Sequence, residues 1–335
     1  MRSRFLDGDF FLGGNFFRMR HWFGLTLVIM ASFLPWGGTL LAQSGHEPAA
    51  HAVAGHAEHA TEEGIPLYAK PIFSIGPLPV TNSMIITWVV ALLLIGGAQV
   101  AMRKARLVPS GAQNFWEFIV EGLYNFLGGV LGHKLAAKTF WFFATLFILI
   151  LATNWFGLIP GVGTIGWGHP DSHGVLHHIS TPILRGANAD LNMTLAMSMI
   201  FFVCWVVWAL QANGPGGFIM HLFGPKGATT GLLKVLMVVV FIAAGLLEVV
   251  SILFRPVSLS FRLFGNIYAG ENMLESMAAI VPSLSGIIPI PFYFMELMVG
   301  LVQALVFMLL TAVFTLLICS HGEDHHDAHG GKKGH

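Results

Sequence analysis

Seven polar side chains of types that can carry or block protons lie in or beside apolar segments of the last third of the chain. They stand where charge is otherwise rare: Glu248, Ser258, Arg262, Asn266, Glu271, Glu296 and Gln303. An ionisable group inside an apolar span costs about 2.5–3.5 kcal/mol to insert, so such groups usually serve a function. Carboxylates can exchange protons, whereas an arginine keeps its charge. The set therefore predicts a proton path that contains one permanent cation.

Four of these residues share one face of a single predicted helix. At about 100° per residue, Glu248, Ser258, Arg262 and Asn266 fall within roughly 80° of one another. Pro256 interrupts the segment and can bend it, so the alignment is approximate. The pattern predicts a polar stripe along a long apolar helix.

The depth of each polar residue separates the seven into two groups. At 1.5 Å per residue, Arg262 lies about 21 Å from Glu248 and about 13 Å from Glu271, near the middle of a membrane. The next span runs in the opposite direction, which brings Glu296 to the outer half and Gln303 to the depth of the arginine. We therefore expect an outer vestibule around Glu271 and Glu296 and an inner one at Glu248, with Arg262 between them.

Simpler interpretations exist for some of these groups. Arg255, close to the helix kink, can be a snorkelling residue or one paired through packing. Glu271 and Glu296 can be a structural polar pair. The histidines in HEPAAHAVAGHAEHA and HGEDHHDAHGGKKGH invite a metal site, but they lack rigid spacing, which favours solvated polar tails.

The composition is that of a membrane protein. Of 335 residues, 55% are hydrophobic and 10% are charged, and the formal net charge is zero, which suggests neither nucleic acid nor any other charged partner. Apolar windows predict five membrane spans, at about 83–102, 139–159, 191–212, 232–268 and 291–319. The segment 110–132 has one apolar side and predicts an amphipathic helix at the interface. The fold class is thus an all-α polytopic membrane protein, whose last two helices are long and strongly tilted.

The ends of the chain have a different character from the apolar middle. Residues 1–42 carry basic residues, an apolar run and a small residue at Ala42, the pattern of a secretory signal peptide. A start at Met19 would give the more usual length, and an uncleaved first membrane helix is the alternative. Residues 43–82 form a His-, Ala- and Pro-rich extracytoplasmic arm, 83–320 the membrane domain, and 321–335 a His-rich cytoplasmic tail.

The distribution of Lys and Arg predicts the orientation. Basic residues gather at 103–106, 134–138, Lys226, Lys234, Lys332 and Lys333, and they are missing from 42–64, 160–180 and 282–290. Under the positive-inside rule, the mature amino terminus lies outside and the carboxyl terminus in the cytoplasm. We expect a multi-pass protein of the cell (inner) membrane.

Several motifs together resemble one family. SLSFRLFGNIYAGE, TNWFGLIPG, ADLNMTLAM, LEVVSILFRPVSL and MELMVGLVQALVFMLLTAVF, found between Ser83 and Ser320, resemble the bacterial type of ATP synthase subunit a, the membrane stator of the Fo motor. The resemblance implies an F-type ATP synthase component that couples proton flow to rotation and ATP synthesis. Its implied partners are a ring of c subunits, the b subunits, the F1 sector and the lipid membrane. No cofactor is implied, and the subunit alone is not an enzyme.

The resemblance also implies a role for each of the seven residues. Arg262 would discharge the carboxylate of the ring and block direct proton passage, with Asn266 and Gln303 as polar neighbours. Glu248 and Ser258 would line the cytoplasmic half-channel. Glu271 and Glu296 would line the outer one, with Asp190 at its mouth. Some relatives have a histidine at the position of Glu271 or of Glu296, which leaves open which of these two glutamates relays the proton.

Two other classes of function fit the sequence less well. A secondary transporter would show internal repeats, and the sequence has no convincing repeat. A membrane enzyme would need a motif such as HExxH or GxSxG or a buried aspartate pair, and none is present. The sequence also has no GxxxxGK[ST] nucleotide motif.

Overall fold

The computed structural model of the chain describes residues 71–75, 78–103, 106, 108–159, 162, 166–167, 181–182, 185–223, 232–280 and 286–330. The predicted signal peptide, most of the arm 43–82 and the histidines of 169–178 lie outside the described residues. The predictions for those segments stay predictions.

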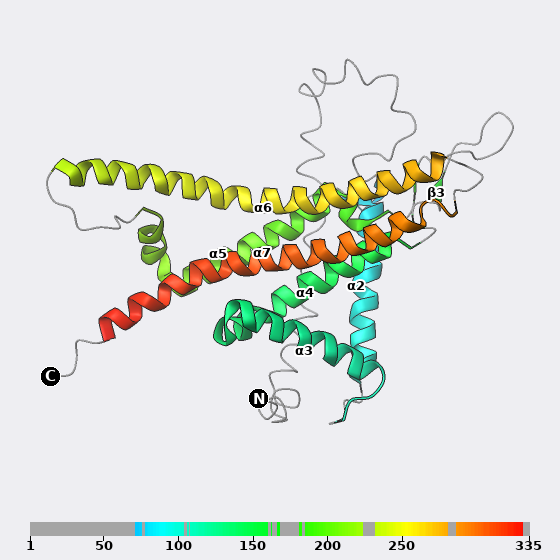
Figure 1. Ribbon diagram of the computed structural model, residues 1–335, viewed down its shortest axis with the longest axis horizontal. Coiled ribbons are helices and arrows are strands. Elements are labelled where there is room, and N and C mark those ends of the chain that lie inside the picture. The colour runs from blue at the N-terminus through cyan, green and yellow to red at the C-terminus, as the bar shows by residue number, and fades with distance from the viewer. Residues whose placement is uncertain are drawn as a thin grey trace, which may run out of the picture.

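The described chain is almost entirely helical (Figure 1). Two short antiparallel strand pairs accompany the helices: β1 (Pro71–Ile75) with β2 (Leu78–Thr81), and β3 (Gly166–Trp167) with β4 (Thr181–Pro182). The helices are α2 (Asn82–Ala101), α3 (Ala112–Leu131), α4 (His133–Gly157), the 3-10 turn η2 (Ala187–Ala189), α5 (Leu191–Phe223), α6 (Leu232–Ile280) and α7 (Ile290–Gly330).

Five of these helices are long and apolar enough to cross a membrane, namely α2, α4, α5, α6 and α7. This confirms the all-α polytopic class, and α3 occupies the segment predicted as an amphipathic helix. Helices α6 and α7 both extend beyond their predicted spans. Helix α6 continues about three turns beyond Tyr268 to Ile280, and α7 continues through the first part of the tail to Gly330. No proline interrupts either extension, so nothing in the backbone forces the helix to stop there.

Helix α5 is broken at Gly214, just after the predicted span 191–212. Gly214 has φ 69° and ψ 163°, a left-handed conformation that favours glycine, and Pro215 follows it. A proline fits the first turn of a helix, so a new helical segment begins there and runs to Phe223. The break therefore lies at Gly214, and the residues that follow it are helical as far as Phe223.

Helices α6 and α7 lie along the long axis of the molecule, whereas α2 lies across it (Figure 1). The apolar part of α6, Val239–Ala278, has 40 residues. It is therefore about 60 Å long, twice a hydrocarbon core of about 30 Å, and fits only if strongly inclined. The inclined pair packs against each other and against α5.

Helix α4 forms the centre of the bundle. Phe142, Phe143, Leu146 and Ile150 are fully buried in the main apolar cluster. In lipid, such packing rather than escape from water holds helices together, aided by interhelical hydrogen bonds of about 0.6 kcal/mol each. The bundle contains several of these bonds: Thr194 to Ser260, Trp205 to the Phe314 carbonyl, and Asn213 to the Ile318 carbonyl.

Candidate functional site

The polar stripe of α6 lies on a face that the described chain leaves uncovered. Glu248, Ser258, Arg262 and Asn266 are all exposed. Their exposed surroundings on the same helix are apolar: Leu247, Phe254 and Phe261. A permanent cation thus stands on a surface with large apolar side chains beside the polar stripe, which suits a second protein that carries an anion.

Asn266 connects this stripe to α7, one helical turn from Arg262. Its Nδ2 donates a hydrogen bond of 2.7 Å to Oε1 of Gln303. Gln303 is only 4% exposed, so this bond fixes the register of α6 against α7 next to the arginine. The structure therefore brings Asn266 and Gln303 into contact one helical turn from Arg262.

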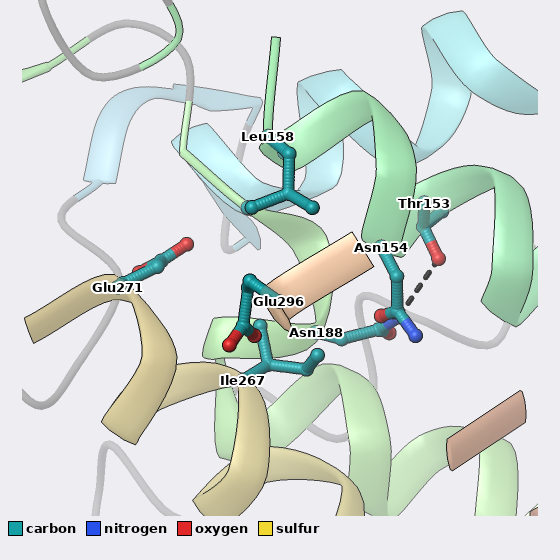
Figure 2. A pocket seen from close by; sticks show the side chains of 9 residues that line it. Thr153, Asn154, Leu158, Asn188, Ile267, Glu271 and Glu296 are labelled. Atoms are coloured by element: carbon teal, nitrogen blue, oxygen red, sulfur yellow. Dashed lines mark hydrogen bonds between the residues drawn. The ribbon is translucent and has the colours of Figure 1, made fainter. Parts of the chain in front are cut away.

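Glu271 and Glu296 line one pocket that is formed by α4, the segment around η2, α6 and α7 (Figure 2). Glu271 comes from α6 and Glu296 from α7. Figure 2 shows Glu296 at the centre, Glu271 on one side and two asparagines on the other. The other walls of the pocket are formed by Thr153, Asn154, Gly157, Leu158, Gly186, Asn188 and Ile267. Within the described residues, Oε1 of Glu296 is buried and has no hydrogen-bond partner.

Two glycines leave the room that these carboxylates occupy. A Cβ at Gly270 would collide with the carboxyl group of Glu296, and one at Gly186 would collide with Oε1 of Glu271. Each carboxylate is therefore seated against the backbone of another element. Because Glu296 is only 4% exposed, the site has little freedom to rearrange.

A polar network at the end of α4 holds α7 beside the pocket. Asn154 donates to the Gly300 carbonyl at 3.0 Å, and the indole of Trp155 donates to the Leu297 carbonyl at 3.2 Å. Asn188 donates to Asn154 at 2.6 Å and to Thr153 at 2.8 Å. The two accepting carbonyls belong to residues one and four positions after Glu296 on α7. The network therefore helps to set the position of this carboxylate.

Glu248 pairs with Arg255 on its own helix. Their Oε1 and Nη2 atoms are 3.2 Å apart, and the guanidinium of Arg255 also lies over the rings of Phe314, at 4.5 Å, and Trp205, at 5.7 Å. Arg255 is therefore a residue paired through packing, and the snorkelling interpretation does not describe its contacts. Glu248 remains half exposed despite this pair.

Asp190 lies at the start of α5 and does not line the pocket. It is 2% exposed and accepts hydrogen bonds from the Ser83 hydroxyl, at 2.7 Å, and from the Asn192 amide, at 3.1 Å. Burial raises the pKa of Asp190, and these two donors and the Arg185 guanidinium oppose that rise. Its position is that of a helix cap that also ties α2 to α5.

The sequence reasoning missed Arg185, Asn188 and Asn154 as members of this region. Arg185 is 4% exposed, and its Nε lies 4.0 Å from Oε2 of Glu271. One signal was present in the sequence: Arg185 is a single basic residue close to a loop, 160–180, that otherwise lacks Lys and Arg. An isolated cation on the side predicted to be outside indicates a specific anionic partner.

Across the ranges that the structure describes, no group of three or more His, Cys, Asp or Glu residues is arranged to hold a metal ion. The histidines of 46–59 are not among them.

Comparisons with known proteins give a consistent answer. Residues 84–315 match the ATP synthase A chain family. A protein of Gloeobacter violaceus named ATP synthase subunit a is 33% identical over 255 residues, which are 76% of this chain and 90% of that protein. Proteins of the same name from Moorella thermoacetica and Trichlorobacter lovleyi are 29% identical over 243 residues and 32% identical over 233 residues. These cover 72% and 70% of this chain, and 93% and 85% of those proteins. The chain belongs to the ATP synthase A chain family.

Proposed function

We propose that this chain is the proton-conducting stator subunit of an Fo sector, in which Arg262 discharges the carboxylates of a rotating c ring. The observation that carries the proposal is the position of Arg262 midway along α6, on a face that the described chain leaves open. An uncovered guanidinium on an apolar helix needs an anionic partner, and family membership suggests the ring.

The chemistry of the step follows from electrostatics. A carboxyl group held in lipid favours its neutral form, because the charged form loses its hydration. Beside Arg262, at about 4 Å and an effective dielectric near 20, the ionised form gains about 4 kcal/mol. A ring carboxyl group that reaches Arg262 therefore releases its proton. After it has moved past Arg262, the same carboxyl group takes up a new proton.

Two access routes on opposite sides of Arg262 would give this exchange a direction. Glu271 and Glu296 would line the outer half-channel, and their shared pocket supports this role. Glu248 and Ser258, exposed on the inner part of the stripe, would line the cytoplasmic one. Asn266 and Gln303 would hold the two helices in register beside the arginine. The guanidinium cannot lose its proton, so it would block direct passage between the routes.

The proposal includes the surroundings of the subunit. The chain would sit in the cell (inner) membrane with its mature amino terminus outside and its carboxyl terminus in the cytoplasm, in accord with the distribution of Lys and Arg. It would contact the c ring and the b subunits and act with the F1 sector. It would itself catalyse no reaction, and each proton would contribute about 2.3 kcal/mol per 100 mV of membrane potential.

The test is Arg262→Lys in the assembled complex, reconstituted into vesicles. A lysine can lose its proton when desolvated, so coupled proton pumping should fall by at least about 100-fold. Arg255→Lys, two helical turns away on α6, is the matched control and should retain pumping. Pumping by Arg262→Lys at the wild-type rate would refute the assignment. Co-purification of ring and ATPase subunits with the tagged chain checks the partners.

A further inference from the structure

Arg185 is a buried cation placed against one of the two outer carboxylates. It lies just before η2, and its side chain is 5% exposed, while that of Glu271 is 18% exposed. Its Nε is 4.0 Å from Oε2 of Glu271. A guanidinium removed from water is costly unless carboxylates compensate it, and Glu271 is placed to supply part of that compensation.

The backbone next to Arg185 fixes the other side of the same carboxylate. Gly186 lies so close to Oε1 of Glu271 that a Cβ would collide with it. Two successive residues thus hold Glu271, one by charge and one by shape. The free volume around the carboxyl group lies in the pocket that it shares with Glu296.

Few charged groups of the described chain act on Glu271. They are Arg185 from the segment before η2, Glu296 from α7 and Glu275 one turn along α6. Arg185 also lies near Asp190, but Asp190 already accepts two hydrogen bonds from Ser83 and Asn192. Arg185 is thus the one cation among these groups.

We propose that Arg185 is a positioning residue for Glu271: it holds the carboxylate at the pocket shared with Glu296 and sets the external pH range over which this pocket exchanges protons. The inference rests on the proposed function. With both pocket carboxylates ionised, they and Arg185 together carry one negative charge, and a single proton makes the group neutral. Without Arg185, neutrality requires two protons. Uncompensated charge is costly in a poorly solvated site, so the pocket would then keep its protons to higher pH.

The experiment uses the assembled complex in vesicles whose outer compartment is titrated at fixed inner pH and fixed membrane potential. In Arg185→Gln and Arg185→Met, the midpoint of proton entry against external pH should move up by about one unit or more, with a lower maximal rate. Arg185→Lys keeps the charge and should stay near the wild-type midpoint. Arg255→Gln removes the other Arg–Glu pair of α6 and should leave the external midpoint unchanged.

A second comparison separates an effect through Glu271 from a general structural effect. Adding Arg185→Gln to a Glu271→Gln complex should move the midpoint clearly less than Arg185→Gln does when Glu271 is present, because Arg185 contacts Glu271 and not Glu296. An unshifted midpoint in an assembled Arg185→Gln complex would overturn the proposal, as would an equal shift without Glu271. If neither Arg185→Gln nor Arg185→Met assembles while Arg185→Lys does, the charge of Arg185 is needed for assembly. That result would also overturn the proposal. Normal pumping by Arg262→Lys would instead refute the proposed function.

Discussion

Substitution of Gly270 by alanine tests whether the close contact between the Gly270 backbone and the Glu296 carboxyl group matters for function. The new methyl group would collide with Cδ and both oxygens of the Glu296 carboxyl group, which cannot leave easily because the side chain is 4% exposed. Alanine favours a helix over glycine by about 0.5–1 kcal/mol. Overpacking costs about 1–3 kcal/mol, so the collision outweighs the gain and leaves a net loss on the order of 1 kcal/mol.

The functional effect of this substitution should exceed its effect on stability. A displacement of a reacting group by about 1 Å can cost about 100-fold in rate. We therefore expect Gly270→Ala to lower proton conduction through Fo by about 10- to 100-fold, while the complex still assembles and melts within a few degrees of the wild type. Conduction is measured in vesicles after removal of F1, and assembly by native gel.

Two companion variants define the cause. At Gly122, in the middle of α3, a methyl group would meet no side chain and no other helix within 4 Å, so Gly122→Ala should conduct normally. Shortening the crowded side chain by one methylene, in Gly270→Ala with Glu296→Asp, should recover part of the lost conduction. Wild-type conduction by Gly270→Ala alone would show that the close contact with Glu296 does not matter and would refute the reasoning.

Two further predictions concern the polar links around the pocket. Asn154→Ala removes the bond to the Gly300 carbonyl and the acceptor of Asn188, so the complex should lose about 1–3 kcal/mol, seen as a lower melting temperature. A phenotype confined to stability, with proton conduction per assembled complex unchanged, would contradict a positioning role for the α4 network. Burial raises the pKa of Asp190, so the folded state holds this proton more tightly than the unfolded state and loses stability as pH rises through that pKa. Asp190→Asn keeps the cap without the charge and should therefore gain stability relative to the wild type as pH rises from about 4, the usual pKa of an aspartate, through the raised pKa of Asp190. The difference is measured by thermal melting, and a constant difference would argue against an ionising Asp190.

Much of the architecture was predictable because it depends on local composition. Apolar length predicted all five spans, and the helical period predicted that Ser258, Arg262 and Asn266 share one face. The end of α6 was harder to predict, since the polar residues Glu271, Asn272 and Glu275 resemble a loop in composition but continue the helix. Averaged hydropathy records that these residues are polar, but it does not record whether the backbone stays helical.

Contacts between segments distant in sequence could not be predicted in this way. The pairing of Arg185 with Glu271 joins residues 86 positions apart, and the seat of Glu296 depends on a glycine of the neighbouring helix. Periodicity assigns a side chain to a face but does not give the register of one helix against another. That register comes from interhelical bonds such as Asn266 to Gln303, which only the folded chain reveals.

The inclination of α6 has a geometric consequence for where the two proposed half-channels open. If a helix of about 60 Å crosses about 30 Å, each residue descends only about 0.75 Å but advances about 1.3 Å sideways. Glu248 and Glu271 are then separated by about 17 Å in height and by about 30 Å along the membrane plane. In the proposed function, the two half-channels would therefore open at different positions along the edge of the c ring, and a proton would have to move with the ring to pass from one to the other.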